Sequence, residues 1–286
     1  MNILIKSTGF IGDILFSTSV ARQMKRDRGF TGLIDYQIPL NAPYEILQLD
    51  NNINRIFLPN EEVDESSYDK VFTLPHCTQE EPPTIQYQKH CGVKELDPSY
   101  DVKVPHSAIE VISNMIRPHR EQGKKIVAWQ GNWEEKSFGY TEEEYKRGVD
   151  VPNLGYGGRR RDINFLVSEL SKRYLLIKVG FDPGVTQNQI GLLTTGIYTH
   201  TTAILSQCDY MIGGESGLIN LAAGVGTKTI ITGDYVHQLY GWNGVIRKLK
   251  EPKLGPEFYF ESGHVSLNPY LTDKEVVEQI INIIGN

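Results

Sequence analysis

Short runs of β-branched and aliphatic residues alternate with longer amphipathic stretches along most of this 286-residue chain. This alternation constrains the fold more than any other feature, because strands separated by helix-length segments are typical of βαβ units and a parallel sheet. The first strand is expected at 3–5, with a helix from residue 11, and the pattern restarts with a strand at 125–129. The expected fold class is therefore α/β, with two Rossmann-like, doubly wound domains that face a central cleft.

The restart of the pattern divides the chain near residue 120. We expect a first domain over 1–120, a second over 121–270 and a C-terminal helix over 271–286, which opens with a capping box at Thr272 and Glu275. The stretch 77–105 is predicted to be irregular because prolines interrupt it. The loops that follow the strands are where a ligand site is expected, since open α/β sheets bind ligands there.

Composition excludes several classes of protein. Charged residues make up 22% and the net charge is −6, which is a poor match to a dedicated nucleic-acid binder. No apolar run approaches the length of a membrane span, and the first residues lack a signal-peptide pattern. The 3 cysteines form no even disulfide framework. We therefore expect a cytoplasmic protein with reduced thiols, and the cysteine and histidine spacing predicts no metal site.

The first motif is a glycine-containing turn over 7–13, between the first strand and the first helix. Gly9 and Gly12 allow the backbone to approach a ligand closely, with Phe10 between them. Asp13 falls in the first helical turn, where the helix dipole stabilises a carboxylate. The turn also matches part of a dinucleotide fingerprint, although the full G-x-G-x-x-G is absent. An NAD(P)-dependent oxidoreductase or epimerase therefore stays open as an alternative.

The second motif, over 208–229, is a strand followed by a turn of small residues and a helix. Its turn reads Gly-Gly-Glu-Ser-Gly, and the free N–H groups at the helix start suit a diphosphate. Glu215 has the acceptor oxygens to bind sugar or ribose hydroxyls. Small residues at 222–224 permit close packing of the helix on its sheet.

Together the two motifs resemble the ADP-heptose:lipopolysaccharide heptosyltransferase family, which is glycosyltransferase family 9 with a GT-B fold. The family opens with a strand, a small-residue turn and Gly-Asp, here Gly12-Asp13. It also carries Asn-Asp-Ser-Gly-Pro-x-His-Leu-Ala-Ala-Ala-x-Gly-Thr-Pro-Thr, which matches 214–229 in order and spacing. The chain departs from this pattern at Glu215, in place of Asp, and at Asn220, in place of His, and it lacks both prolines.

The resemblance implies an inverting glycosyltransferase that moves a sugar from a nucleotide-diphosphate sugar to an acceptor hydroxyl, with Asp13 as general base. It implies no metal and no cofactor besides the donor substrate. The family places a lysine near the leaving diphosphate, matched here by Lys136, with the cluster Arg159, Arg160 and Arg161 as the rival. The expected donor-binding residues are Gly131, Asn132, Gly180, Glu215, Ser216 and Gly217. The expected acceptor-binding residues are Gly9, Phe10 and Gly12.

Several alternatives stay open at this stage. The acceptor is a glycolipid or saccharide, or a hydroxymethylated base in DNA, as in phage-type DNA glycosyltransferases. The DNA reading rests on the basic residues of 247–253, which have aromatic neighbours. A sugar-nucleotide-binding protein without catalysis is a further alternative. The sequence does not specify the donor nucleotide, its sugar or the oligomeric state.

Overall fold

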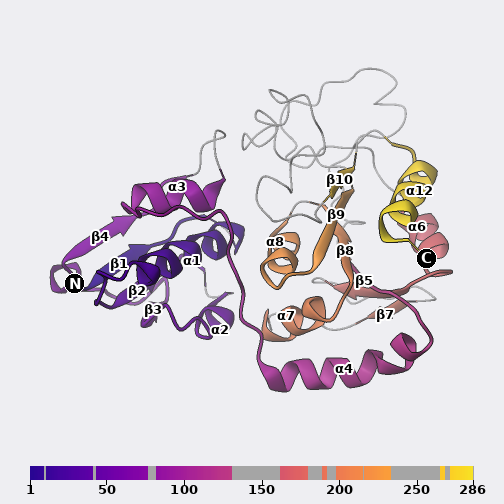
Figure 1. The fold of residues 1–286 in the computed structure, drawn as a ribbon, viewed down its shortest axis with the longest axis horizontal. Helices are drawn as coiled ribbons and strands as arrows, with labels where there is room; N and C mark the ends of the chain where they lie inside the picture. The colour runs from indigo at the N-terminus through magenta and orange to yellow at the C-terminus, as the bar shows by residue number, and fades with distance from the viewer. Residues whose placement is uncertain are drawn as a thin grey trace.

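The computed structural model describes most of the chain as two parallel β-sheets with helices packed on them (Figure 1). The described residues are 1–9, 11–40, 43–76, 82–130, 162–179, 189–191, 198–214, 216–232, 265–267 and 271–285. None of the helices in these ranges combines the length and the hydropathy of a transmembrane span.

The first sheet has the strand order β3-β2-β1-β4, and all its pairs are parallel. Its strands are β1 (Ile3–Lys6), β2 (Ile34–Gln37), β3 (Arg55–Phe57) and β4 (Lys70–Thr73). The second sheet has the order β10-β9-β8-β5-β6-β7, again with parallel pairs. Its strands are β5 (Ile126–Gln130), β6 (Leu175–Val179), β7 (Gln189–Gly191), β8 (Tyr210–Gly213), β9 (Lys228–Thr232) and β10 (Val265–Leu267).

Both sheets follow the Rossmann order, in which the first strand along the chain lies between the second and the fourth. The α/β, doubly wound fold expected from the sequence is therefore confirmed. The helices are α1 (Ile11–Arg26), α2 (Tyr44–Leu47), η1 (Glu65–Ser67), α3 (Pro83–His90), α4 (His106–Glu121), α6 (Ile163–Leu170), α7 (Tyr198–Ser206), α8 (Gly217–Gly224) and α12 (Asp273–Ile284). The capping box of α12 is present as predicted. The division of the chain at residue 120 stays a prediction.

One expectation about helices was wrong. The stretch 77–105 contains α3, because Pro83 occupies the start of that helix, where a missing N–H costs nothing. The prolines there mark a helix start as well as a loop. Helix α4 continues through Pro118.

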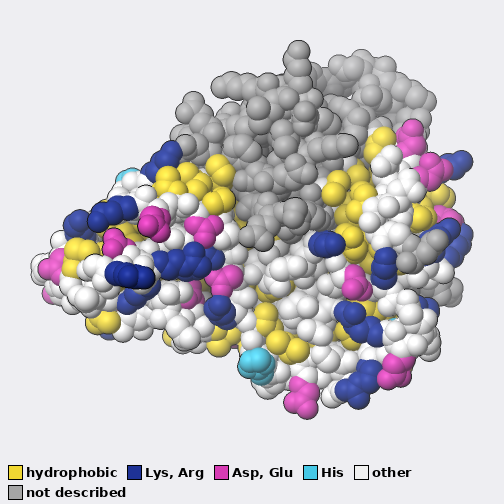
Figure 2. Space-filling model, in the orientation of Figure 1, with side chains coloured by type: hydrophobic (Ala, Val, Ile, Leu, Met, Phe, Trp, Pro, Cys, Tyr) yellow, Lys and Arg dark blue, Asp and Glu magenta, His cyan; other side chains and the backbone are white. Residues whose placement is uncertain are grey.

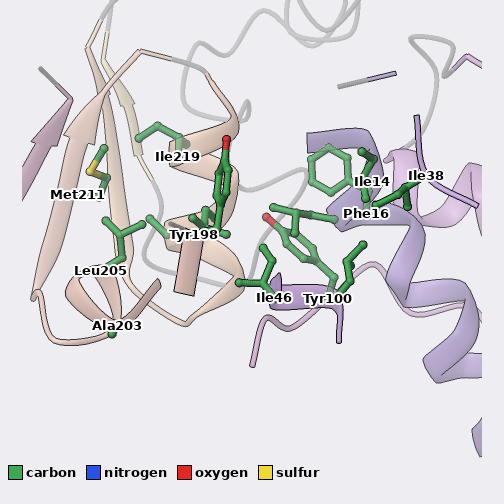
Figure 3. Close-up of a cluster of buried hydrophobic side chains, with 14 of the residues drawn as sticks. Ile14, Phe16, Ile38, Ile46, Tyr100, Tyr198, Ala203, Leu205, Met211 and Ile219 are labelled. Carbon is green, nitrogen blue, oxygen red and sulfur yellow. The ribbon is translucent and has the colours of Figure 1, made fainter. Parts of the chain in front are cut away.

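One hydrophobic core connects the two halves of the molecule. Side chains of the first half, such as Phe16 and Ile46, belong to the same cluster of buried residues as Tyr198 and Ile219 of the second half (Figure 3). A separate cluster lies on the other face of the second sheet, beneath α6 and α12. Burial of apolar surface stabilises at roughly 25 cal/mol per Å². The shared core therefore opposes separation of the halves.

The segment that leaves the first half is anchored to α1 by charged groups. Asp97 accepts hydrogen bonds from Arg26 at 3.0 Å and from the Ser99 hydroxyl at 2.6 Å. Arg22 donates to Asp101 at 3.1 Å. Burial alone would raise the pKa of Asp97, but hydrogen bonds from Ser99 and the charge of Arg22 outweigh burial and lower that pKa. The ionised form of Asp97 therefore stabilises the folded chain.

Asp97→Asn is expected to lower the free energy of unfolding at neutral pH by about 1–3 kcal/mol, because charge-assisted hydrogen bonds are lost. A lowered folded-state pKa gives stability that is present above the ordinary aspartate pKa and is lost as pH falls through the folded value. The difference between wild type and variant should therefore shrink below about pH 4. Urea unfolding at several pH values measures it.

The control is Glu278→Gln, which removes a surface ion pair with Lys274 of 3.9 Å and should change stability by less than about 1 kcal/mol. The free energies of unfolding of wild type and Asp97→Asn are compared as the pH falls. A difference that stays constant on acidification would contradict a stabilising, ionised Asp97.

Candidate functional site

The two predicted motifs follow the strands at which the strand order of each sheet reverses. In the first sheet this point lies between β1 and β4, and in the second it lies between β5 and β8. Ligands of doubly wound folds bind outside the carboxyl ends of the strands at such points. Side-chain hydrogen bonds bridge both of them: Thr8 donates to the carbonyl of Leu74 at 3.0 Å, and Ser216 donates to Oε1 of Gln130 at 3.0 Å.

In the first half, Asp13 folds back over the turn that precedes α1. Gly9 has a φ of +82°, and a β-carbon built on it would lie 2.3 Å from Oδ2 of Asp13. Gly9 therefore provides both the backbone conformation and the space that the carboxylate occupies. The other oxygen, Oδ1, accepts a hydrogen bond of 3.3 Å from the Tyr87 hydroxyl of α3. Asp13 also lies in the first turn of α1, where the helix dipole favours a negative charge.

In the second half, α8 begins at Gly217 with Ser216 as its N-cap. The Ser216 hydroxyl makes no capping hydrogen bond and instead points to Gln130, the last residue of β5. Gly213 permits this arrangement, because a β-carbon there would lie 3.0 Å from the Gln130 side chain. The start of α8 thus carries backbone N–H groups without a side-chain cap, a geometry that suits an anion.

The starts of α1 and α8 contact each other, so the two motifs form one region. A β-carbon on Gly217 would lie 3.2 Å from Cβ of Ile11, and one on Gly12 would lie 2.6 Å from Nδ2 of Asn220. Tyr100 reinforces the contact by donating to the Asn220 carbonyl at 2.5 Å. The structure therefore brings together Gly9, Gly12 and Asp13 of the first half with Ser216 and Gly217 of the second.

Other predicted site residues lie outside the described part of the chain. They are Phe10, Gly131, Asn132, Lys136, Arg159, Arg160, Arg161, Gly180, Glu215 and the basic stretch 247–253. Their roles stay predictions. On the face shown in Figure 2, basic and acidic side chains of the described residues are interspersed over both halves.

Two residues at the site were not identified from the sequence. Gln130 directly precedes Gly131, so its place at the end of a strand was available as a signal. Tyr87 lies in the stretch predicted to be irregular, and recognising Pro83 as a helix start would have placed it on a helix. Its proximity to Asp13 depends on the packing of α1 against α3, which no local pattern encodes.

The cysteines at the described positions are poor nucleophiles. Burial raises the pKa of Cys91 and of Cys208 to about 12, so both thiols stay protonated at neutral pH. Within the described ranges, no group of three His, Cys, Asp or Glu side chains is placed to hold a metal ion. The chemistry available among the described residues at this site is that of a carboxylate, hydroxyls, amides and a helix start.

A cavity of about 610 Å³ lies at the opposite end of the first sheet. Its lining includes Ile3, Lys70, Met24 and Cys91, at the amino ends of strands and the last turns of α1 and α3. Parallel sheets bind ligands at their carboxyl ends. This cavity is therefore separate from the candidate site.

Comparison with solved structures identifies the architecture. A family 9 glycosyltransferase from Veillonella parvula DSM 2008 superposes with a TM-score of 0.64 at 9% identity, over 99% of this chain and 97% of that one. The E. coli ADP-heptose LPS heptosyltransferase II gives 0.58 at 12% identity, over 99% and 98%. The chain has the GT-B fold.

The E. coli heptosyltransferase WaaC, solved with ADP-2-deoxy-2-fluoro heptose, has the same GT-B architecture, with a TM-score of 0.58 at 11% identity over 100% of both chains. The sequence itself matches no protein-family model and no curated protein. The resemblance seen in the two motifs is thus confirmed at the level of the fold. Because the match covers the whole chain, both halves correspond to the two lobes of these GT-B proteins.

Gly9→Ala is expected to lower stability by about 1–2 kcal/mol from the left-handed backbone alone, and further because the new methyl group displaces Asp13. Gly92→Ala is the matched control, since Gly92 has a φ of +72° and its β-carbon would meet nothing within 4 Å. Thermal unfolding measures the stability lost in each variant. The additional loss in Gly9→Ala over Gly92→Ala is the cost of displacing Asp13. Equal destabilisation would contradict the position of the carboxylate.

Proposed function

We propose that this protein is an inverting glycosyltransferase that moves a sugar from a nucleotide-diphosphate sugar to an acceptor hydroxyl. The observation that carries the proposal is the contact between the starts of α1 and α8, which puts an acidic side chain and an anion-binding helix start in one region. The GT-B fold supports the same reaction class, because the similar solved structures are glycosyltransferases.

In this proposal the start of α8 binds the diphosphate, and Asp13 is the general base. The acceptor hydroxyl gives its proton to Asp13, its oxygen bonds to the anomeric carbon, and the bond from that carbon to the diphosphate breaks. The departing electron pair stays on the diphosphate, where the N–H groups of α8 stabilise the charge. Attack opposite to the leaving group inverts the anomeric centre.

The two domains would then bind different substrates. The first domain, 1–120, would hold the acceptor near Gly9, Phe10 and Gly12. The second, 121–270, would hold the donor through Ser216 and Gly217, with Gly131, Asn132, Gly180 and Glu215 completing the donor site. Lys136 or the arginines 159–161 would bind the diphosphate. ADP-sugars are the first donors to test, because WaaC was solved with an ADP-heptose analogue and with ADP.

The donor is identified first by thermal shift with ADP-, UDP- and GDP-sugars, since a bound ligand raises the melting temperature by mass action. Asp13→Asn should then reduce release of the nucleoside diphosphate by at least about 100-fold, the usual contribution of a general base. The melting-temperature shift with donor should persist in the variant, because donor binding is assigned to α8.

Asp27→Asn is the control, since Asp27 lies just beyond the other end of α1 and should leave turnover near the wild-type rate. Turnover of Asp13→Asn close to that of wild type would remove Asp13 as the base. A protein that no nucleotide sugar stabilises or reacts with would argue against a glycosyltransferase.

A further inference from the structure

Tyr87 is a buried phenol whose hydroxyl reaches the candidate base. Its side chain is 1% exposed and projects from α3, which packs along α1 (Figure 1). The O–H donates to Oδ1 of Asp13 at 3.3 Å. A carboxylate accepts such a bond more strongly when ionised, so the contact favours the charged form and limits rotation of the side chain.

The two oxygens of Asp13 therefore have different surroundings. Oδ1 is the oxygen nearer α3, and Oδ2 lies over Gly9, within 2.3 Å of where a β-carbon on that glycine would be. Rotation of the carboxylate away from this orientation would break the bond to Tyr87. The phenol thus keeps one oxygen towards α3 and the other over the glycine turn.

We propose, resting on the function proposed above, that Tyr87 is a positioning residue that holds Asp13 so that Oδ2 receives the proton. The missing side chain of Gly9 leaves the space in which this oxygen lies, and the acceptor hydroxyl then approaches the same oxygen. Its proton passes to Oδ2, its oxygen bonds to the anomeric carbon, and the diphosphate leaves with the electron pair of the broken bond. Tyr87 gains and loses nothing in this step; it keeps the carboxylate oriented, and correct orientation lowers the barrier.

Few other titratable groups on the neighbouring helices compete with this contact. On α3 the other titratable side chains are Lys89 and His90, in its last turn. Helix α8 has none. The basic residues of α1 begin at Arg22, more than two turns from Asp13. Among the described residues of these three helices, the Tyr87 phenol is thus the titratable group placed against the carboxylate.

Tyr87→Phe tests the proposal, because it removes the hydroxyl and keeps the ring. Release of ADP from ADP-heptose, or of the nucleoside diphosphate from whichever nucleotide sugar stabilises the protein, is measured against pH. We expect kcat to fall about tenfold with KM for the donor unchanged, which corresponds to the loss of about one hydrogen bond. The acid limb of the rate–pH profile should move to higher pH, because the carboxylate loses a donor that favours its charged form.

Tyr36→Phe is the matched control. Tyr36 is also a fully buried tyrosine, and its O–H donates at 2.7 Å to the backbone carbonyl of Ser17, which lies on α1 as Asp13 does. Loss of the Tyr36 hydroxyl should lower the melting temperature without moving the acid limb of the rate–pH profile. If Asp13→Asn is inactive but Tyr87→Phe keeps the wild-type kcat and an unmoved acid limb, the positioning role of Tyr87 is overturned. If Asp13→Asn is active, the function on which that role rests is overturned instead.

Discussion

The close contact between the first turns of α1 and α8 is the constraint on which the rest of this structure depends. Ile11 lies against Gly217, and the Asn220 side chain lies against Gly12, at separations that leave no space for a β-carbon at Gly12 and little at Gly217. The last residue of α8 is equally restricted, because a β-carbon on Gly224 would lie 2.6 Å from Val102. The glycines let α1 approach α8, and let the segment with Val102 approach the end of α8. The shared hydrophobic core stabilises that approach.

Topology explains why this contact coincides with the candidate chemistry. Each sheet reverses its strand order beside its first strand, and each motif directly follows a strand at that point. When the two halves face each other through α1 and α8, the carboxylate of one and the helix start of the other are brought together without any long loop. Gln130 and Tyr87 then support the two sides: one binds the N-cap serine of α8, and the other binds the carboxylate in α1.

Much of this arrangement was predictable from the sequence because it is local. The alternation of strand and helix patterns, the glycines of the first turn and the capping box of α12 depend on residues close together in the chain. The position of Tyr87 was not predicted, because the prolines around α3 indicated an irregular stretch. The packing of α3 on α1 is a tertiary contact that no local pattern encodes. Asn220 shows the same limit: the sequence marks it as a departure from a family pattern, whereas only the structure shows its backbone carbonyl bound by Tyr100 and its amide against Gly12.

A crystal structure of the protein with ADP bound tests the central claim most directly. We predict the diphosphate within hydrogen-bond distance of the backbone N–H groups that begin α8. Its outer phosphate should face the carboxylate of Asp13 across the region between the two helix starts. A nucleotide bound elsewhere, or an Ile11 side chain that lies between the diphosphate and the N–H groups of α8 in the complex, would contradict this prediction.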